Sequence, residues 1–425
     1  MLGAEGDRSY LVVFMNNAEL RGAGGLPSGI GTLHLDNGRI DLGEFEYIGE
    51  LTEPHPYRRV AAPDDFDRRF GEFYADTTLW SNLTLSPDLP DVAVVADRLY
   101  QLKRQQSSDG VLFVDPRGLQ VLMPAGSSVA TPNGQQIDKA NLTDFIYEDA
   151  YQNIQDPQLR RQVMLLFGHA IFELITEQGI GDLTELGAAV AGGHLRFVPF
   201  EVDEAELMAE TGASGDLTPP EIDGLLATVQ ATAAHKLDYY VDRSVTHRCD
   251  VTDDMAACGT SVELRNDTPE GLSDFAAPEE PYGLLQNFLE IYVPRAASVT
   301  SVRRDGETEG FIRNRQDGYT SVGFDLELER DAATTVTVAY EIELDAHRYE
   351  LIARPQPLAR DATLELELDF PADWAVFGPG SVRGATLSYS GVFNGTIEVR
   401  ARLKQRSGIS LAWERLAGFM NEPLF

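Results

Sequence analysis

The sequence is short of positive charge and of long apolar runs, and each shortage excludes a class of partner. Its 425 residues include 34 Lys and Arg against 68 Asp and Glu, a formal net charge of −34. Nucleic acids and anionic membrane surfaces are bound through clustered positive charge, so neither is an expected partner. No stretch approaches the ~18 uninterrupted apolar residues that span a bilayer. A site for an anionic ligand must therefore be a local cluster of Arg set against the charge of the whole chain.

The common catalytic signatures are also missing: the chain has no P-loop, HExxH, GxSxG or CxxC motif. Its seven His are scattered and its Cys number only two, so a zinc site is not expected. Cys249 and Cys258 flank a turn-like segment between two alternating strands. A hairpin disulfide, typical of proteins outside the cytosol, is geometrically plausible there, and two free thiols are the alternative.

The start of the chain lacks a signal peptide, because Met1–Arg8 has neither a basic region nor an apolar one. A strand follows almost at once, at Tyr10–Met15. We expect a natural N-terminal anchor to precede this start, so that membrane contact would run only through a segment absent from this sequence.

Hydrophobic periodicity changes near residue 236. Before it, strands at Tyr10–Met15 and 110–115 alternate with helices at Pro90–Gln106 and Leu159–Glu177, and 52–70 reads as an exposed loop. After it, short period-two strands are separated by Gly, Pro, Asp or Asn turns. We predict an α/β domain with a mixed sheet and flanking helices over 1–235, then all-β antiparallel sandwich domains: a β-sandwich over 236–345 and a smaller β segment with a tail over 346–425.

The strongest candidate site is the polar, glycine-rich segment NNAELRGAGG at 16–25. It follows a buried strand, at the edge where open α/β sheets place ligands. We take Glu19 as a candidate catalytic residue. A loop whose Asn side chains satisfy their own backbone is the alternative. The candidate substrate-binding residues here are Asn16, Asn17, Arg21, Gly24 and Gly25.

A second polar cluster is WSNLTLSPDLP at 80–90. Trp80 could stack on a sugar ring, with Asn82 and Ser86 beside it as substrate-binding groups, and Asp88 is a candidate catalytic carboxylate. Helix capping by Ser86 or Asp88 is the alternative.

A third cluster is DPQLRRQ at 156–162, at the start of the second helix. Arg160 and Arg161 face different sides of this helix, and two guanidinium groups at a helix N-terminus could bind phosphate or carboxylate. A solvated first turn is the alternative.

These segments resemble, in order, an uncharacterised actinobacterial family, domain of unknown function 4012 (DUF4012). The resemblance runs from about Tyr10 to Asp345 and includes SSDGVLFVDPRGLQVLM, DKANLTDFIYEDAYQNIQDPQLRRQ and KLDYYVDRSV. Members of that family usually carry an N-terminal transmembrane segment. This sequence has GAGGLP where the family commonly has PTGGF, and SSV where GPV is usual, differences that bear on the substrate pocket.

The N-terminal half is more distantly similar to the LytR-CpsA-Psr (LCP) enzymes. Those enzymes transfer wall glycopolymers from polyprenyl-pyrophosphate carriers to peptidoglycan, using Asp and Arg residues with a divalent metal. The parallels are the pair Glu19 and Arg21, the strand and acidic turn at 110–116, and the helix opening Arg161-Gln162. The Ser-Ile-Pro-Arg-Asp segment of LCP enzymes is replaced here by LGEFEYIGE at 42–50, so an Arg and an Asp are missing.

The two resemblances imply an extracytoplasmic, cell-envelope enzyme that transfers or cleaves a glycopolymer of the arabinogalactan type. Its partner would be a cell-wall polysaccharide or a lipid-linked glycan. In a transferase, Arg21, Arg160 and Arg161 would hold a pyrophosphate, while Glu19 or Asp88 would bind Mg²⁺ or Mn²⁺ or activate the acceptor.

Two alternatives remain open. A glycoside hydrolase or transglycosylase cleaving a wall polysaccharide such as arabinan would need two carboxylates and no cofactor. Its candidate carboxylates are Glu19, Glu44, Glu46 and Asp88. The third possibility is a non-catalytic, glycan-binding scaffold of the envelope.

Overall fold

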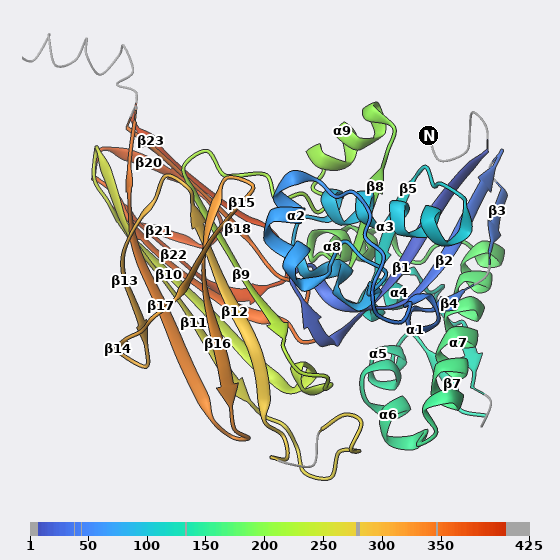
Figure 1. The fold of residues 1–425 in the computed structure, drawn as a ribbon. Helices are drawn as coiled ribbons and strands as arrows, with labels where there is room; N and C mark the ends of the chain where they lie inside the picture. Colours follow the sequence, from blue (N-terminus) through green and yellow to red (C-terminus); the bar gives the residue numbers. More distant parts are fainter. Residues whose placement is uncertain are drawn as a thin grey trace, which may run out of the picture.

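The computed structural model describes residues 7–404 apart from Gly38, Glu44, 132–133, 278–280 and Ala346. These residues form an α/β domain and a β-sandwich that lie side by side (Figure 1). The predicted order, an α/β part followed by a strand-rich part, is confirmed. Within the described ranges, no helix has the length and apolar character needed to cross a membrane.

The α/β domain is built on a mixed six-stranded sheet with the order β3-β2-β1-β5-β8, in which β4 also pairs with β2. The strands are β1 (Arg8–Arg21), β2 (Gly24–Asp36), β3 (Arg39–Leu42), β4 (Glu46–Tyr47), β5 (Gly110–Val114) and β8 (Leu195–Pro199). β1 runs parallel to β5 and antiparallel to β2. The predicted strand at Tyr10–Met15 is the buried centre of this sheet, as its continuous apolar run requires.

Helices cover both faces of the sheet. On one face, α3 (Leu89–Arg104) packs with α1 (Ile48–Leu51) and α2 (Asp64–Phe70) against Leu11 and Val13. On the other face, α4 (Pro116–Leu122) and α7 (Pro157–Gln178) pack against Val12 and Val114. The remaining elements of this domain are α5 (Leu142–Asp144), α6 (Ala150–Asn153), α8 (Leu183–Ala191), α9 (Val202–Glu210), β6 (Ser128–Ala130) and β7 (Gln136–Asp138).

Both predicted long helices are confirmed, as α3 and α7, with ends within two residues of the expected ones. The exposed loop expected over 52–70 is only partly correct. Its last third forms α2, because Phe66 and Phe70 are buried against the sheet while the Asp and Arg between them mostly face outward.

The segment 16–25, predicted to follow the strand at the edge of the sheet, forms the end of one strand and the start of the next. β1 continues through Arg21 and pairs with β2 as far as Arg21 opposite Gly24, with an irregularity between Asn16 and Leu20. A Cβ on Gly25 would lie 2.7 Å from the carbonyl carbon of Asn16, and Gly24 has a φ of +124°. The glycines therefore serve the close approach of the two strands of this hairpin.

The sandwich consists of an eight-stranded sheet, β14-β13-β17-β11-β10-β19-β22-β21, and a seven-stranded sheet, β15-β16-β12-β9-β18-β23-β20. Neighbouring strands are mostly antiparallel, but β10 with β19 and β9 with β18 are parallel. The sandwich is thus mixed rather than purely antiparallel as predicted. The strands are β9 (Asp223–Ala231), β10 (Val241–Val251), β11 (Met255–Asn266), β12 (Leu285–Pro294), β13 (Ser298–Arg304), β14 (Glu307–Thr308), β15 (Ile312–Gln316), β16 (Tyr319–Leu328), β17 (Ala333–Glu343), β18 (Arg348–Arg354), β19 (Ala362–Asp369), β20 (Trp374–Phe377), β21 (Ser381–Arg383), β22 (Thr386–Phe393) and β23 (Ile397–Leu403).

Both sheets contain strands from 236–345 and strands from 346–404, which lie as two adjoining groups that meet where β10 pairs with β19 and where β9, from before residue 236, pairs with β18. Alternate side chains of the two sheets meet in one apolar core. Cys249 on β10 stands directly opposite Cys258 on β11, and the expected disulfide between them is confirmed.

The end of β1 anchors the α/β domain to the sandwich. The Leu20 amide donates a hydrogen bond to Asp238 Oδ2 at 2.7 Å, and Gln356 Nε2 donates to the Arg21 carbonyl at 2.7 Å. A buried ion pair between Arg69 of α2 and Glu290 of β12 adds a second connection. The hydrogen bonds with Asp238 and Gln356 therefore fix the end of β1 against the sandwich.

Candidate functional site

A cavity opens where β1 and β5 cease to pair, between these strands and α7. About 1050 Å³ of space lies between its side chains and in its opening to solvent. Most of the wall is apolar. The apolar side chains that line it include Phe14, Met15, Leu26, Phe45, Val114, Leu119, Ile146, Met164, Leu165 and Phe167.

One part of the wall is cationic. Arg160 is 5% exposed, stacks 4.1 Å from the Phe275 ring centroid, and donates from Nη1 to the Ile154 carbonyl at 2.8 Å. Arg161 lies 4.5 Å from the Tyr47 ring centroid and is exposed. Lys236, from the segment that enters the sandwich, completes the group. Three cations thus converge in a chain whose net charge is −34.

Glu19 holds Lys236 in place from behind the cavity wall. Its carboxylate accepts from Lys236 Nζ and, at 3.3 Å, from Arg21 Nη2. Burial by itself would raise the pKa of Glu19, but the two cations outweigh burial and lower it. Glu19 therefore stays ionised and orients Lys236 rather than lining the cavity itself.

Arg21 does not reach the cavity. It is 7% exposed, and its Nη1 donates to the carbonyls of Leu20 at 2.9 Å and Ala231 at 3.2 Å. Its predicted role as a pyrophosphate ligand is therefore not supported, because its terminal nitrogens are occupied inside the protein. Gly24 and Gly25 likewise pack against protein, Gly24 beside Pro357 and Gly25 on the Asn16 backbone.

Asp115, directly after β5, is the one acidic residue among the described residues that line the cavity. Its Oδ2 lies 2.6 Å from His194 Nδ1 and accepts from Asn17 Nδ2 at 3.0 Å. Its Oδ1 accepts from the Gly118 amide at 2.9 Å and so caps α4. Nearby, Asn16 donates from Nδ2 to the Tyr151 hydroxyl at 2.7 Å. Asn16 thus lines the cavity, while Asn17 positions Asp115.

The second predicted cluster lies elsewhere. Trp80 is 1% exposed in the core under α3, so neither face of its ring is available to a sugar. Asn82 donates to the Phe73 carbonyl at 2.7 Å, and Ser86 Oγ accepts from Gln316 Nε2 at 2.9 Å. The stacking role expected of Trp80 is wrong, because the indole fills the apolar core instead.

Asp88 belongs to an acidic cluster with Asp91 and Asp317, in which one carboxylate oxygen of each lies within 4.8 Å of the others. Burial, reinforced by Asp91 and Asp317, raises the pKa of Asp88 to about 7. Its Oδ1 accepts from the Leu217 amide at 2.6 Å, and its side chain makes no capping bond to α3. Neither Ser86 nor Asp88 lines the cavity.

The predicted catalytic carboxylates are not brought together. Glu46 on β4 accepts from Arg104 Nε at 3.1 Å, Glu19 faces Lys236, and Asp88 faces Leu217. Glu44 lies outside the described residues. Each of these three carboxylates has a protein partner of its own, and none of them lines the described part of the cavity.

Sequence reasoning found Asn16, Arg160 and Arg161 and missed other residues around the cavity. In the sequence, Asp115 follows the apolar run at 110–114 just as Asn16 follows the run Tyr10–Met15, so the same argument would have selected it. Lys236 and Phe275 carry no local signal, because they reach the cavity only through the packing of the two domains. The missed residues are Asp115, Tyr151, His194, Lys236 and Phe275.

The fold and the cavity define an α/β domain with an amphiphilic, cationic site, joined to a mixed β-sandwich. Residues 5–151 match the family model of DUF4012, a protein family of unknown function, which confirms the resemblance over that stretch. No curated protein matches the chain.

Solved structures show only faint similarity. A "putative nutrient binding protein" from Legionella pneumophila aligns with a TM-score of 0.28 and 6% identity over 48% of this chain and 78% of that one. An M1 zinc metallopeptidase from Deinococcus radiodurans has a TM-score of 0.25 and 9% identity, covering 38% of this chain and 42% of its own. A yeast LTA4 hydrolase has a TM-score of 0.26 and 9% identity, covering 40% and 30%. Scores this low carry no argument about fold or function.

Proposed function

We propose that the protein is an extracytoplasmic, LCP-like enzyme that transfers a cell-envelope glycan from a lipid-linked carrier, and that the cavity binds the carrier. The observation that carries this proposal is the combination, in one cavity, of a largely apolar wall with three cations. A lipid-linked glycan phosphate has the same two properties, an apolar chain next to an anionic group.

The apolar wall favours a lipid chain over a free sugar. Each buried CH₂ group contributes about 0.8 kcal/mol, so a few isoprenyl carbons against Phe14, Met164 and Phe167 would already give measurable affinity. Of the aromatic rings near the cations, Tyr47 and Phe275 each have one face covered by a guanidinium group, which a sugar could not then use.

The cations would hold the phosphate. Arg161 can offer a planar, bidentate pair of donors, and Lys236 a point charge whose position Glu19 maintains. Fixed charges of this kind stabilise the negative charge on the phosphoryl oxygens during transfer. The cations of the cavity therefore provide local positive charge for an anion in a chain whose net charge is negative.

A divalent metal, which the LCP resemblance implies, does not fit this donor set. Mg²⁺ and Mn²⁺ prefer several oxygen ligands. The described part of the cavity offers one carboxylate, Asp115. Its Oδ1 already accepts from the Gly118 amide, and its Oδ2 accepts from Asn17 Nδ2 and lies 2.6 Å from His194 Nδ1. We derive no step through a metal.

We assign the role of proton acceptor to Asp115, because its Oδ1 accepts a single hydrogen bond, from the Gly118 amide, and so keeps a second lone pair. The acceptor oxygen would form a bond to the phosphorus next to the glycan while that phosphorus loses its bond to the lipid phosphate. The acceptor proton would pass to Asp115, whose charge His194 supports at 2.6 Å. The lipid phosphate leaves with its electron pair.

The test is to incubate the full chain with a polyprenyl-pyrophosphate-linked glycan and an acceptor wall fraction, with and without EDTA, and to identify products by mass spectrometry. We expect polyprenyl phosphate to be released, and release to be lost in Asp115→Asn and reduced in Arg161→Ala. Arg248→Ala, on the sandwich surface, is the matched control. Phosphate-free oligosaccharides would instead establish a glycoside hydrolase, and binding without any product would establish a glycan-binding scaffold.

A further inference from the structure

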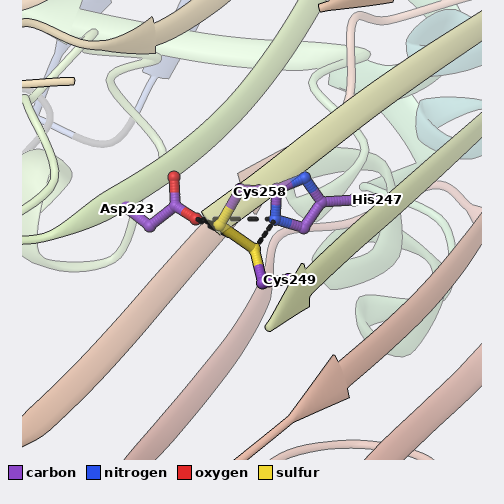
Figure 2. A group of neighbouring side chains, drawn as sticks. All are labelled: Asp223, His247, Cys249 and Cys258. Atoms are coloured by element: carbon purple, nitrogen blue, oxygen red, sulfur yellow. Dashed lines mark hydrogen bonds and ion pairs between the residues drawn. A yellow bond between two sulfur atoms is a disulfide. The ribbon is translucent and has the colours of Figure 1, made fainter. Parts of the chain in front are cut away.

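The core of the sandwich contains a cluster of four polar side chains that the cavity does not use (Figure 2). Asp223 begins β9 in one sheet, while His247 and Cys249 on β10 and Cys258 on β11 come from the other. Asp223 and His247 are 0% exposed, and the two cysteines are at most 5% exposed. Polar groups this deeply buried are stable only when they are hydrogen-bonded or coordinate a metal.

Strand geometry explains why these residues meet. His247 and Cys249 are two apart on β10 and therefore point to the same face. Cys258 stands opposite Cys249 in the β10–β11 register, and Asp223 reaches the group from the facing sheet. One atom of each residue lies within 4.8 Å of those of the other three, with Asp223 and His247 beside the disulfide (Figure 2).

The distances between these atoms are short. Cys249 Sγ lies 3.1 Å from His247 Nε2 and 3.7 Å from Asp223 Oδ2. Asp223 Oδ2 lies 3.5 Å from Cys258 Sγ and 3.5 Å from His247 Nε2. A disulfide has no hydrogen to donate, so the sulfur atoms do not satisfy the carboxylate or the imidazole.

We propose that in the reduced protein Asp223, His247, Cys249 and Cys258 bind one Zn²⁺ ion. With Zn–S near 2.3 Å and Zn–N or Zn–O near 2.0 Å, a tetrahedral site has S···N and S···O edges of about 3.5 Å and an N···O edge of about 3.3 Å. The four separations given above, from 3.1 to 3.7 Å, lie within about 0.4 Å of those edges. Once their bond is reduced, the two sulfur atoms have to move apart to about 3.8 Å.

The surrounding residues hold the ligands as the outer shell of a metal site does. His247 Nδ1 lies 2.9 Å from Thr260 Oγ1, and when that nitrogen carries the proton, Nε2 presents its lone pair to the cluster. Asp223 Oδ1 accepts from the Gly224 amide and the Tyr340 hydroxyl, both at 2.8 Å, and Oδ2 accepts from the Tyr349 hydroxyl at 2.5 Å.

Thiolates together with imidazole and carboxylate select Zn²⁺ over Mg²⁺ or Ca²⁺, which prefer oxygen ligands alone. Conversion of the disulfide form into the reduced, zinc-binding form needs two electrons and two protons, which a dithiol reductant can supply. The dithiol gives two electrons and two protons to the Cys249–Cys258 bond and becomes a disulfide itself. Binding of Zn²⁺ then releases the two thiol protons. Because the cluster lies in the core, the ion would enter as the reduced sandwich folds.

In the test, the full chain is folded in the presence of zinc sulfate and a thiol-free phosphine reductant. Unbound metal is then removed by gel filtration. We expect about one zinc ion per chain by elemental analysis. Cobalt in place of zinc should give the visible bands of a tetrahedral ion and a sulfur-to-cobalt band in the near ultraviolet. Oxidation with diamide should release the metal and lower the intact mass by two hydrogens per chain.

Two variants separate this site from surface binding. His247→Ala should lose the metal, whereas His169→Ala, which changes a histidine that is 42% exposed on α7, should keep it. If His247→Ala does not fold, the cobalt spectrum of the unmodified chain still decides. A reduced chain that holds no zinc, or zinc that survives in the double variant Cys249→Ser/Cys258→Ser, would overturn the proposal.

Discussion

The two halves of the molecule bury polar groups in opposite ways. At the cavity, the buried side chains of Arg160 and Lys236 each keep one side toward the open space. In the sandwich, Asp223 and His247 are enclosed on all sides and find partners only in the protein core. The comparison teaches that burial alone does not mark a binding site. What matters is whether the partners of a polar group leave a side free.

The largest expected effect concerns the contact between the two halves. Arg69→Met leaves Glu290, which is 0% exposed, without its cation, so we expect the free energy of unfolding to fall by about 3–5 kcal/mol. Chemical denaturation measures this. The double variant Arg69→Met/Glu290→Leu should recover most of the loss, since it leaves no buried charge. A single variant as stable as the parent would show that the pair does not join the halves.

A smaller effect is expected at Asp88, and it depends on pH. Burial raises the pKa of this carboxyl in the folded state from 3.8 to about 7, so the folded protein binds the proton more tightly than the unfolded chain. The resulting stabilisation is fully present below about pH 4 and is lost as the pH rises through about 7.

Asp88→Asn should therefore stabilise the protein at pH 7.5 by about 1–3 kcal/mol and have little effect near pH 4. Its amide oxygen can still accept from Leu217. Thermal unfolding at both pH values measures this, with the exposed Asp242→Asn of β10 as the control. Destabilisation at pH 7.5 would show that the charged form of Asp88 is the favoured one.

At the cavity we expect an effect of similar size, on the affinity for a ligand rather than on the free energy of unfolding. Arg161→Ala should weaken binding of a short-chain polyprenyl phosphate about tenfold, because one charge-assisted hydrogen-bond donor is lost. Isothermal titration measures this, and Arg161→Lys should recover part of the affinity by restoring the charge. Equal affinity in Arg161→Ala would place the anion elsewhere.

The smallest effect is expected on the sandwich surface. Arg248 and Glu367 form an ion pair at 2.9 Å, with both side chains more than half exposed. Arg248→Ala should change the free energy of unfolding by less than about 0.5 kcal/mol, since solvent screens such pairs. A loss comparable to that of Arg69→Met would break the contrast between enclosed and exposed charges.

Local sequence patterns were sufficient for the elements and for part of the site. The apolar run Tyr10–Met15 predicted the central strand, and the apolar spacing in 159–177 predicted α7. Arg160 and Arg161 were selected because they open that helix, and both line the cavity. The same kind of reasoning gave a wrong prediction for Trp80, because its polar neighbours in the sequence do not reveal that the indole packs in the core.

The sequence by itself determined the order of elements and the change from α/β to period-two strands, since these depend on short-range periodicity, and it left the Cys249–Cys258 pairing as one of two possibilities. Only the tertiary structure decided that Lys236 joins Arg160, that Glu19 and Arg21 turn into the protein, and that Asp223 meets His247 across two sheets. Those contacts join residues far apart in the chain, and their positions follow from how the two halves pack rather than from any local pattern.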